Sequence, residues 1–71
     1  MKSFSGKCFA AIRRASGYTQ KTIGESVGTS ERMVRKWEGG DAEPTASFLL
    51  RLMVLLNCSA QDLLIDPDAN Q

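Results

Sequence analysis

The sequence predicts an all-α domain of five short helices, and three observations support this prediction. Apolar residues recur at spacings of three and four, and no segment shows the alternation that is typical of a strand. Glycine or proline separates the first four helical segments, and serine or threonine stands at the start of each of the five. The 71 residues are 42% hydrophobic and 24% charged, which indicates one small globular domain. We expect a core over residues 3–65 and a polar C-terminal tail over residues 66–71.

The first helix is expected from Ser3 to Ala15, before Gly17, which suits a left-handed cap. Its predicted inward face holds Phe4, Cys8, Ala11, Ile12 and Ala15. Thr19 is expected to cap a second helix from Gln20 to Val27, because its hydroxyl can accept a free amide hydrogen bond. Gly28 is expected to end that helix.

A third helix is predicted to follow Thr29 or Ser30 as its cap and to reach about Glu38, before Gly39 and Gly40. Its expected inward face holds Met33, Val34 and Trp37. We interpret Trp37 as a core residue rather than as part of a ligand site.

Pro44 and Thr45 signal the start of a fourth helix that reaches about Leu56. It is apolar almost all round, through Phe48, Leu49, Leu50, Leu52, Met53, Val54, Leu55 and Leu56. One apolar stripe satisfies a core, so the remaining apolar side chains must cover something else. Ser59-Ala-Gln-Asp62 resembles a capping box and predicts a short fifth helix through Ile65, before Asp66-Pro67.

The charges are divided unevenly between the two halves of the chain. Residues 1–38 carry eight Lys or Arg and three acidic residues, whereas residues 39–71 carry one Arg and five acidic residues. A basic half beside an acidic half favours a polyanionic partner on one side of the molecule.

The composition gives little support to chemistry or to a membrane location. The chain has no His, so no Ser–His or Cys–His pair can form, and two separated cysteines cannot supply a four-ligand zinc site. We therefore expect no enzyme activity, no cofactor and no metal. Cys8 and Cys58 are interpreted as buried reduced thiols, although a disulfide is possible by count. No apolar run is long enough to span a bilayer, and the N-terminus lacks a signal-peptide pattern, so we expect a cytoplasmic protein.

The segment from Gln20 to Glu38 combines small or apolar residues at fixed spacing with unpaired polar ones. Gln20, Gly24, Gly28 and Val34 occupy relative positions 1, 5, 9 and 15 of a helix-turn-helix unit, whose second helix enters the major groove of DNA. A small Gly24 permits a close helix crossing, and Gly28 permits the turn. The side chains expected to point outward from the second helix of the unit are those of Ser30, Glu31, Arg32, Arg35 and Lys36.

These residues, with others around them, resemble the Cro/CI-type (XRE-type) helix-turn-helix family, which includes the lambdoid phage repressors. The resemblance covers about Phe4 to Ile65. It rests on Arg13, Ser16-Gly-Tyr-Thr-Gln20, Ile23-Gly24, Val27-Gly-Thr-Ser30, Val34, Trp37-Glu-Gly-Gly40, Pro44 and the Cys58–Leu64 end. It implies a lambda repressor-like fold. This chain departs from the family in having Gly24 where Ala is usual, which costs roughly 1 kcal/mol of helix propensity.

The resemblance also implies roles for the matched positions. Glu31, Arg32 and Lys36 match base-reading positions, with Arg35 beside them and with Thr29 and Ser30 at the groove edge. Gln20 matches a phosphate contact, and Arg13 with Glu38 matches a partly buried ion pair. Lys2, Lys7, Arg14 and Lys21 are further expected phosphate contacts, and Thr29 at the groove edge is expected to contact a phosphate as well. An ordinary solvated face would explain any of these charges equally well.

The sequence thus leaves two functional hypotheses. The first is a sequence-specific transcriptional regulator, a repressor that binds a double-stranded DNA operator as a homodimer through the fourth and fifth helices. The second is a protein-binding module, such as an antitoxin that holds a toxin, because the same fold recurs there. Leu50, Val54 and Leu64-Ile65 either complete the core or cover a two-fold interface between two copies of the chain.

Overall fold

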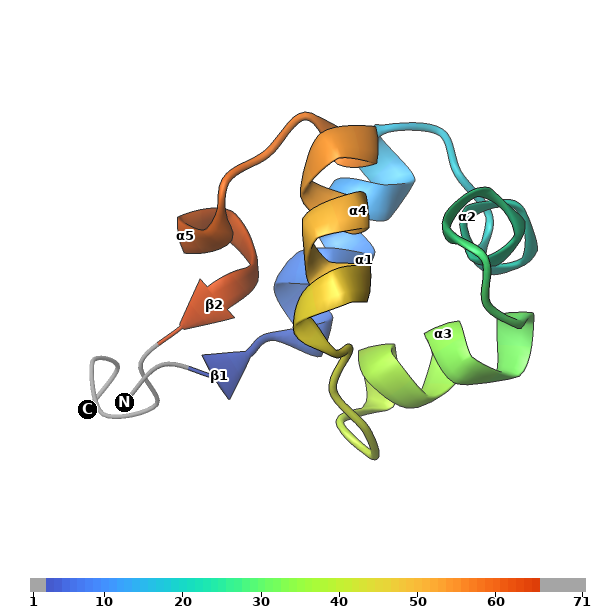
Figure 1. Cartoon of the computed structure of the whole chain (residues 1–71), viewed down its shortest axis with the longest axis horizontal. Helices are drawn as coiled ribbons and strands as arrows, with labels where there is room; N and C mark the ends of the chain where they lie inside the picture. The colour runs from blue at the N-terminus through green and yellow to red at the C-terminus, as the bar shows by residue number, and fades with distance from the viewer. Residues whose placement is uncertain (1–2, 66–71) are drawn as a thin grey trace.

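The computed structural model describes residues 3–65, which form five helices and two short strands (Figure 1). In chain order these are β1 (Ser3–Phe4), α1 (Gly6–Ala15), α2 (Gln20–Val27), α3 (Glu31–Gly39), α4 (Ala46–Leu56), α5 (Ala60–Leu63) and β2 (Leu64–Ile65). The expected polar tail over residues 66–71 and the stop at Asp66-Pro67 lie outside the described residues. The observed fold is compact and mostly helical, and its five helices agree with the predicted fold class.

The two strands correct the expectation that the chain has no strand. Ser3 pairs with Ile65 and Phe4 with Leu64 in an antiparallel ladder, and the Ser5 amide donates to the Leu63 carbonyl at 2.8 Å. Strands of two residues are too short to show any alternation in sequence, so only the pairing of the two chain ends reveals them. The same pairing makes the expected helical residues Leu64 and Ile65 part of a strand.

The start of α1 also differs from the prediction, because Ser3 lies in a strand. Ser5 is the N-cap, and its hydroxyl accepts the Cys8 amide at 3.1 Å. The predicted inward face was wrong in part: Phe9 and Ala10 are buried, whereas Ala11 and Ala15 are exposed. The inward face was misjudged because a charged residue, Arg13, occupies it one turn after Phe9.

Helices α2 and α3 were predicted to within one residue at each end. The Thr19 hydroxyl accepts the Thr22 amide at 3.0 Å, and Gly28 ends α2 with a φ of +90°. The Ser30 hydroxyl accepts the Met33 amide at 3.1 Å, which makes Ser30 rather than Thr29 the cap of α3. A left-handed residue after each helix accounts for the sharp stops.

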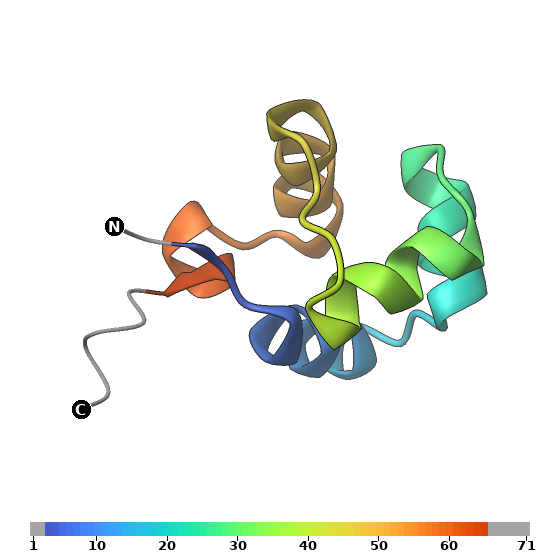
Figure 2. The same ribbon diagram turned by 90° about the horizontal axis from the view of Figure 1, so that it is seen from below.

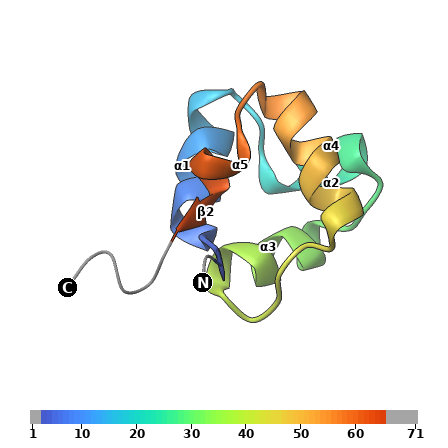
Figure 3. The same ribbon diagram turned by 60° about the vertical axis from the view of Figure 1, so that its left-hand side comes forward.

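Thr45 is the N-cap of α4 rather than its first residue, and Asn57 ends this helix in the left-handed conformation with a φ of +53°. Ser59 and Asp62 form the predicted capping box of α5, with the Ser59 amide 2.9 Å from the Asp62 carboxylate. Figure 3 shows α1 beside α5, and α3 across one side of the molecule.

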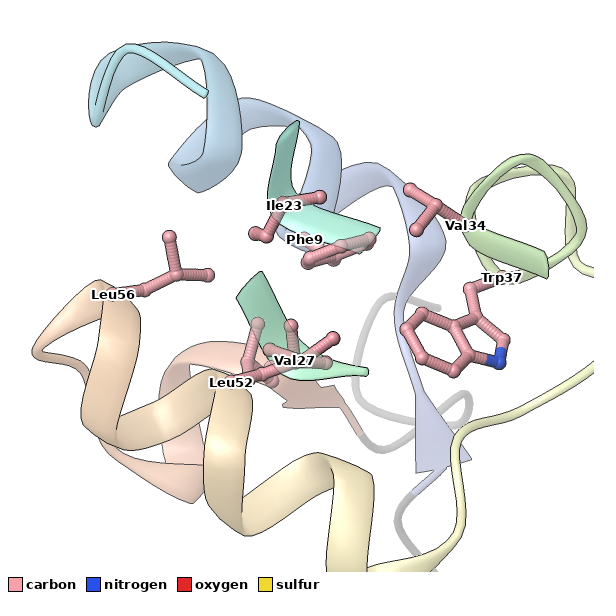
Figure 4. Close-up of a cluster of buried hydrophobic side chains, with 8 residues drawn as sticks. Phe9, Ile23, Val27, Val34, Trp37, Leu52 and Leu56 are labelled. Atoms are coloured by element: carbon pink, nitrogen blue, oxygen red, sulfur yellow. The ribbon is translucent and has the colours of Figure 1, made fainter. Parts of the chain in front are cut away.

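All five helices contribute to the core, part of which is shown in Figure 4. Its buried members are Phe9, Ile23, Val27, Val34, Trp37, Leu52, Leu56 and Leu63. Trp37 is 2% exposed and lies between two other aromatic rings, with centroid distances of 6.2 Å to Phe9 and 5.5 Å to Phe48. The interpretation of Trp37 as a core residue is confirmed.

Cys8 and Cys58 are free thiols, as expected, but each is only half-buried. Burial, and then the negative charge of Asp62, raises the pKa of the Cys58 thiol above its usual value. None of the helices within residues 3–65 is long and apolar enough to cross a membrane.

Candidate nucleic-acid interface

The angle between α2 and α3 depends on two glycines. A Cβ atom at Gly24 would lie 3.1 Å from the Ser30 carbonyl carbon and oxygen, so the first turn of α3 approaches α2 more closely than most side chains permit. The amides of Gly28 and Thr29 both donate to the Gly24 carbonyl, at 3.0 Å and 2.8 Å. This turn fixes the direction in which α3 leaves α2.

Helix α3 lies at one edge of the molecule, and no other element covers its outer side in Figures 1 and 2. Val34 and Trp37 attach its inner side to the core. Its outer side carries the five residues that the sequence predicted to point outward. Ser30, Arg32 and Arg35 are exposed, and Glu31 and Lys36 are half-buried.

The outward charges differ in whether they have a partner. Glu31 and Arg35 form an exposed ion pair of 2.8 Å one turn apart, which the i, i+4 spacing of a Glu before an Arg could have predicted. The ion pairs found within residues 3–65 are this one and Arg13–Glu38. Arg32 and Lys36 therefore carry charges that no carboxylate of the described chain neutralises.

Glu38 joins three helices at the back of α3. Its carboxylate accepts from Arg13 Nε at 2.6 Å and Nη2 at 3.2 Å, and from Gln20 Nε2 at 3.0 Å. Arg13 Nη1 also donates to the Tyr18 carbonyl at 2.8 Å, and the Arg13 and Glu38 side chains are only 9% and 10% exposed. The expected Arg13–Glu38 pair is thus present. The Gln20 contact with Glu38, which the sequence did not signal, holds the start of α2 against α3.

A groove of about 500 Å³ lies beside this cluster, between α1 and α3. We call it the basic groove; it is lined by Gly6, Lys7, Ala10, Arg14, Gln20, Arg35, Glu38 and Gly39. Because Arg13 already neutralises Glu38, the groove keeps the positive charge of Lys7 and Arg14. Three of the expected phosphate contacts, Lys7, Arg14 and Gln20, are brought together here.

Two more of the expected phosphate contacts lie elsewhere, and the expected contact Lys2 lies outside the described residues. Lys21 is exposed on α2 and does not line the basic groove. Thr29 is half-buried beside a smaller hollow that Met33 and Trp37 also line.

Arg51 supports the turn between α2 and α3 in a way that the sequence did not indicate. Its Nη1 atom donates to the Val27 carbonyl at 3.0 Å, at the end of α2, and its guanidinium carbon lies 5.4 Å from the centre of the Phe48 ring. A cation at a helix C-terminus is favourable because the free carbonyls there carry partial negative charge. The one available sequence signal was that Arg51 is the lone cation of the acidic half.

Gly6 determines how closely α1 approaches the end of α3. A Cβ atom at this position would lie 2.5 Å from the carbonyl oxygens of both Trp37 and Glu38, which are backbone atoms and cannot rotate away. Nothing in the sequence around Gly6 signalled this contact.

We therefore expect Gly6→Ala to lower the free energy of unfolding by about 1–3 kcal/mol, because α1 must shift away from α3. Urea unfolding followed by tryptophan fluorescence measures this change. Gly39→Ala is the matched control, since its Cβ would meet only the Asp41 carboxylate at 3.5 Å, an ordinary contact. Equal stability of Gly6→Ala and the wild type would contradict the close approach of α1 and α3.

Within residues 3–65 no group of three or more His, Cys, Asp or Glu side chains is arranged to hold a metal ion. The described surface instead offers a convex helix with free cations and a neighbouring basic groove. This combination suits a polyanion with a groove that admits a helix. Lys and Arg side chains that neutralise its phosphates release counterions, which increases the binding affinity.

Comparison with known proteins gives matches over most of the chain. Residues 9–63 match a protein-family model described as helix-turn-helix. The HTH-type transcriptional regulator DicA of Escherichia coli (strain K12) is 32% identical over 59 residues, which are 83% of this chain and 44% of DicA. The chain thus spans less than half the length of that relative.

Two solved structures of the P22 c2 repressor are also similar, each at 32% identity and over 80% of this chain. One is a crystal structure in complex with a synthetic operator, with a TM-score of 0.74 over 86% of that chain. The other is a nuclear magnetic resonance structure of the DNA-binding domain, with a TM-score of 0.73 over 75% of that chain.

Proposed function

Because this chain belongs to the helix-turn-helix family, we propose that it is a transcriptional regulator that binds specific double-stranded DNA sequences, with α3 in the major groove. The observation that carries this proposal is the outer side of α3, where Arg32 and Lys36 have no carboxylate partner within the described chain. The major groove admits one helix and presents a distinct donor and acceptor pattern for each base pair. We propose repression at an operator, in the cytoplasm, and a binding role rather than an enzymatic one.

In this proposal the outer side of α3 contacts base edges, and the basic groove contacts the phosphate backbone. Ser30, Glu31, Arg32 and Lys36 lie where a helix in the groove meets base edges. Lys7, Arg14 and Gln20 lie beside α3, where one phosphate backbone would pass, and Lys21 and Thr29 are proposed as outer contacts of the same kind. Phosphate contacts position the protein, whereas base contacts select the sequence.

Selection from a pool of random duplexes, followed by sequencing, tests the proposed function. We expect one short consensus site to emerge and to bind this chain at least about 1,000-fold more tightly than random DNA. A pool that stays random after selection at low salt would contradict the proposal, because electrostatic binding alone carries no sequence preference.

The basic groove makes a separate prediction about salt dependence. Lys7→Gln should weaken binding to all duplexes equally and reduce the slope of log affinity against log salt by about 0.9. Gln61→Glu is the matched control: it changes the net charge by the same amount on α5, which contributes no residue to the lining of the basic groove. If both variants flatten the slope equally, overall charge explains the effect and Lys7 contacts no phosphate.

We further propose that two copies bind together, through the apolar side of α4. Leu50 and Val54 are 61% and 82% exposed, so they are not part of the core, while Leu64 and Ile65 are half-buried in β2. Leu50 and Val54 line a mostly apolar groove together with Ser26, Val27, Arg51 and Leu55, whereas Leu64 and Ile65 do not line it. An exposed apolar patch of this kind is typical of a protein-binding surface.

Sedimentation of the wild type and of Val54→Ser tests the dimer, because this exposed side chain contributes little to the fold of one copy. A wild-type mass of two chains that falls to one in the variant supports it. A wild type that is monomeric both free and on its selected duplex would contradict it. The patch would then favour the second candidate function, docking of a different protein such as a toxin.

A further inference from the structure

We infer that the DNA site of this chain presents guanines to Arg32 and Lys36, about two base pairs apart, and that Arg35 contacts the backbone instead of a base. This inference rests on the proposed function and specifies the class of sequence that α3 recognises. It follows from which hydrogen-bonding groups the outer side of α3 offers, and from where the structure places them.

The two cations without a carboxylate partner can only donate hydrogen bonds. A guanidinium or an ammonium group has no acceptor. Guanine presents two acceptors, O6 and N7, in the major groove, whereas adenine presents N7 beside the N6 amino donor. A donor-only side chain such as Arg32 or Lys36 therefore pairs fully with guanine and meets a repelling donor on adenine.

The side chains that pair with adenine through two hydrogen bonds are missing from this surface. Asn and Gln pair with adenine through one donor and one acceptor, and α3 with its cap, ranging over residues 30–40, contains neither. Met33, the apolar residue nearest the outer side, is half-buried and packs against the core. The Ser30 hydroxyl already accepts the Met33 amide as the helix cap. Bidentate readout of adenine by α3 thus lacks a suitable partner, and thymine offers Arg32 or Lys36 one acceptor, O4, where guanine offers two.

Arg35 belongs to a different part of the surface. It lines the basic groove with Lys7 and Arg14, whereas Arg32 and Lys36 do not. Its Nη2 atom is held by Glu31 at 2.8 Å, toward the start of the helix. The structure therefore separates Arg35 from the base-reading side chains with which the sequence grouped it, and places it with the expected phosphate contacts.

The spacing of the two guanines follows from helix geometry. Arg32 and Lys36 are four residues apart, which is roughly 6 Å along a helix axis. Successive base pairs are separated by roughly 3.4 Å. A helix lying along the major groove therefore brings these side chains to base pairs about two steps apart. Glu31, next to Arg32, keeps acceptor capacity that suits the amino group of a cytosine.

Parallel selections with the wild type and with Arg32→Gln test the inference. The wild type should select guanine at two positions about two base pairs apart, each preferred about 5- to 150-fold over adenine. Arg32→Gln should change one of these positions from guanine to adenine, because Gln pairs with adenine N6 and N7. Arg32 is exposed, so this variant should fold as the wild type does. Lys7→Gln is the control and should leave both preferences unchanged.

A second measurement uses the selected duplex with 7-deazaguanine, which lacks the N7 acceptor, at one guanine at a time. Substitution at the base read by Arg32 should weaken wild-type binding and leave Arg32→Ala binding unchanged. A sequence-selective wild type that prefers A·T pairs, or an Arg32→Gln variant with the wild-type consensus, would overturn the inference and leave the proposed function intact. Absence of any selected sequence would overturn both.

Discussion

Replacing Glu38 with alanine is expected to lower the free energy of unfolding by about 3–5 kcal/mol, because it leaves a buried positive charge without a partner. The Arg13 side chain is 9% exposed and donates two hydrogen bonds to Glu38. The substitution also removes the acceptor of Gln20. Since a domain of this size rarely exceeds about 3–5 kcal/mol of stability, most molecules of the variant should be unfolded.

Urea unfolding of Glu38→Ala and of Glu31→Ala measures this effect with a control on the same helix. The Glu31–Arg35 pair is exposed, with side chains 41% and 59% accessible, so its loss should cost less than about 1 kcal/mol. Replacement of both partners, as Arg13→Met with Glu38→Leu, should recover part of the loss, because no charge then stays buried alone. Equal stabilities for the two Glu→Ala variants would contradict the structural role of Glu38.

Trp37→Ala is expected to have an effect of similar size, about 3–5 kcal/mol, through the cavity that it leaves in the core. Trp37 attaches α3 to the rings of Phe9 on α1 and Phe48 on α4. Its removal therefore loosens the helix that we propose as the reader, as well as the core.

Because Trp37 is the one tryptophan of the chain, unfolding of this variant is followed by far-ultraviolet circular dichroism. Trp37→Phe is the matched control: it keeps an aromatic ring between Phe9 and Phe48 and should lose less than half as much stability. If Trp37→Ala unfolds at the wild-type urea concentration, Trp37 is not the anchor of α3.

The parts of the fold that could be predicted are those that local chemistry determines. A hydroxyl before each of α2 and α3 and a glycine after each define their ends, and neighbours a few residues away supply both signals. Gly24 and Gly28 were informative for the same reason. Gly24 allows the close approach of α3, and Gly28 adopts the positive φ that the turn needs.

The parts that could not be predicted depend on residues far apart in sequence. Ser3 and Ser5 are equally good caps by composition, and pairing with β2 decides between them. A Cβ at Gly6 is excluded by the end of α3, more than thirty residues later. The apolar period did not place Arg13 on the buried face of α1, and only the family resemblance indicated its pair with Glu38, twenty-five residues later.

The candidate site shows the same division. The sequence indicated which side chains of α3 point outward, because the period of the helix and two buried residues define its faces. It did not separate Arg35 from Arg32 and Lys36, because that distinction depends on the position of α1 beside α3. The contacts of Gln20 and Arg51 were likewise invisible before the helices were placed.

The claim that α3 reads base edges is tested most directly by one ratio, the affinity for the selected duplex divided by that for a scrambled duplex of the same composition. In the double variant Arg32→Ala with Lys36→Ala, we predict that this ratio falls toward one, while Lys7→Gln lowers both affinities and keeps the ratio. A folded double variant with the wild-type ratio would show that selectivity comes from another surface, and would contradict the account.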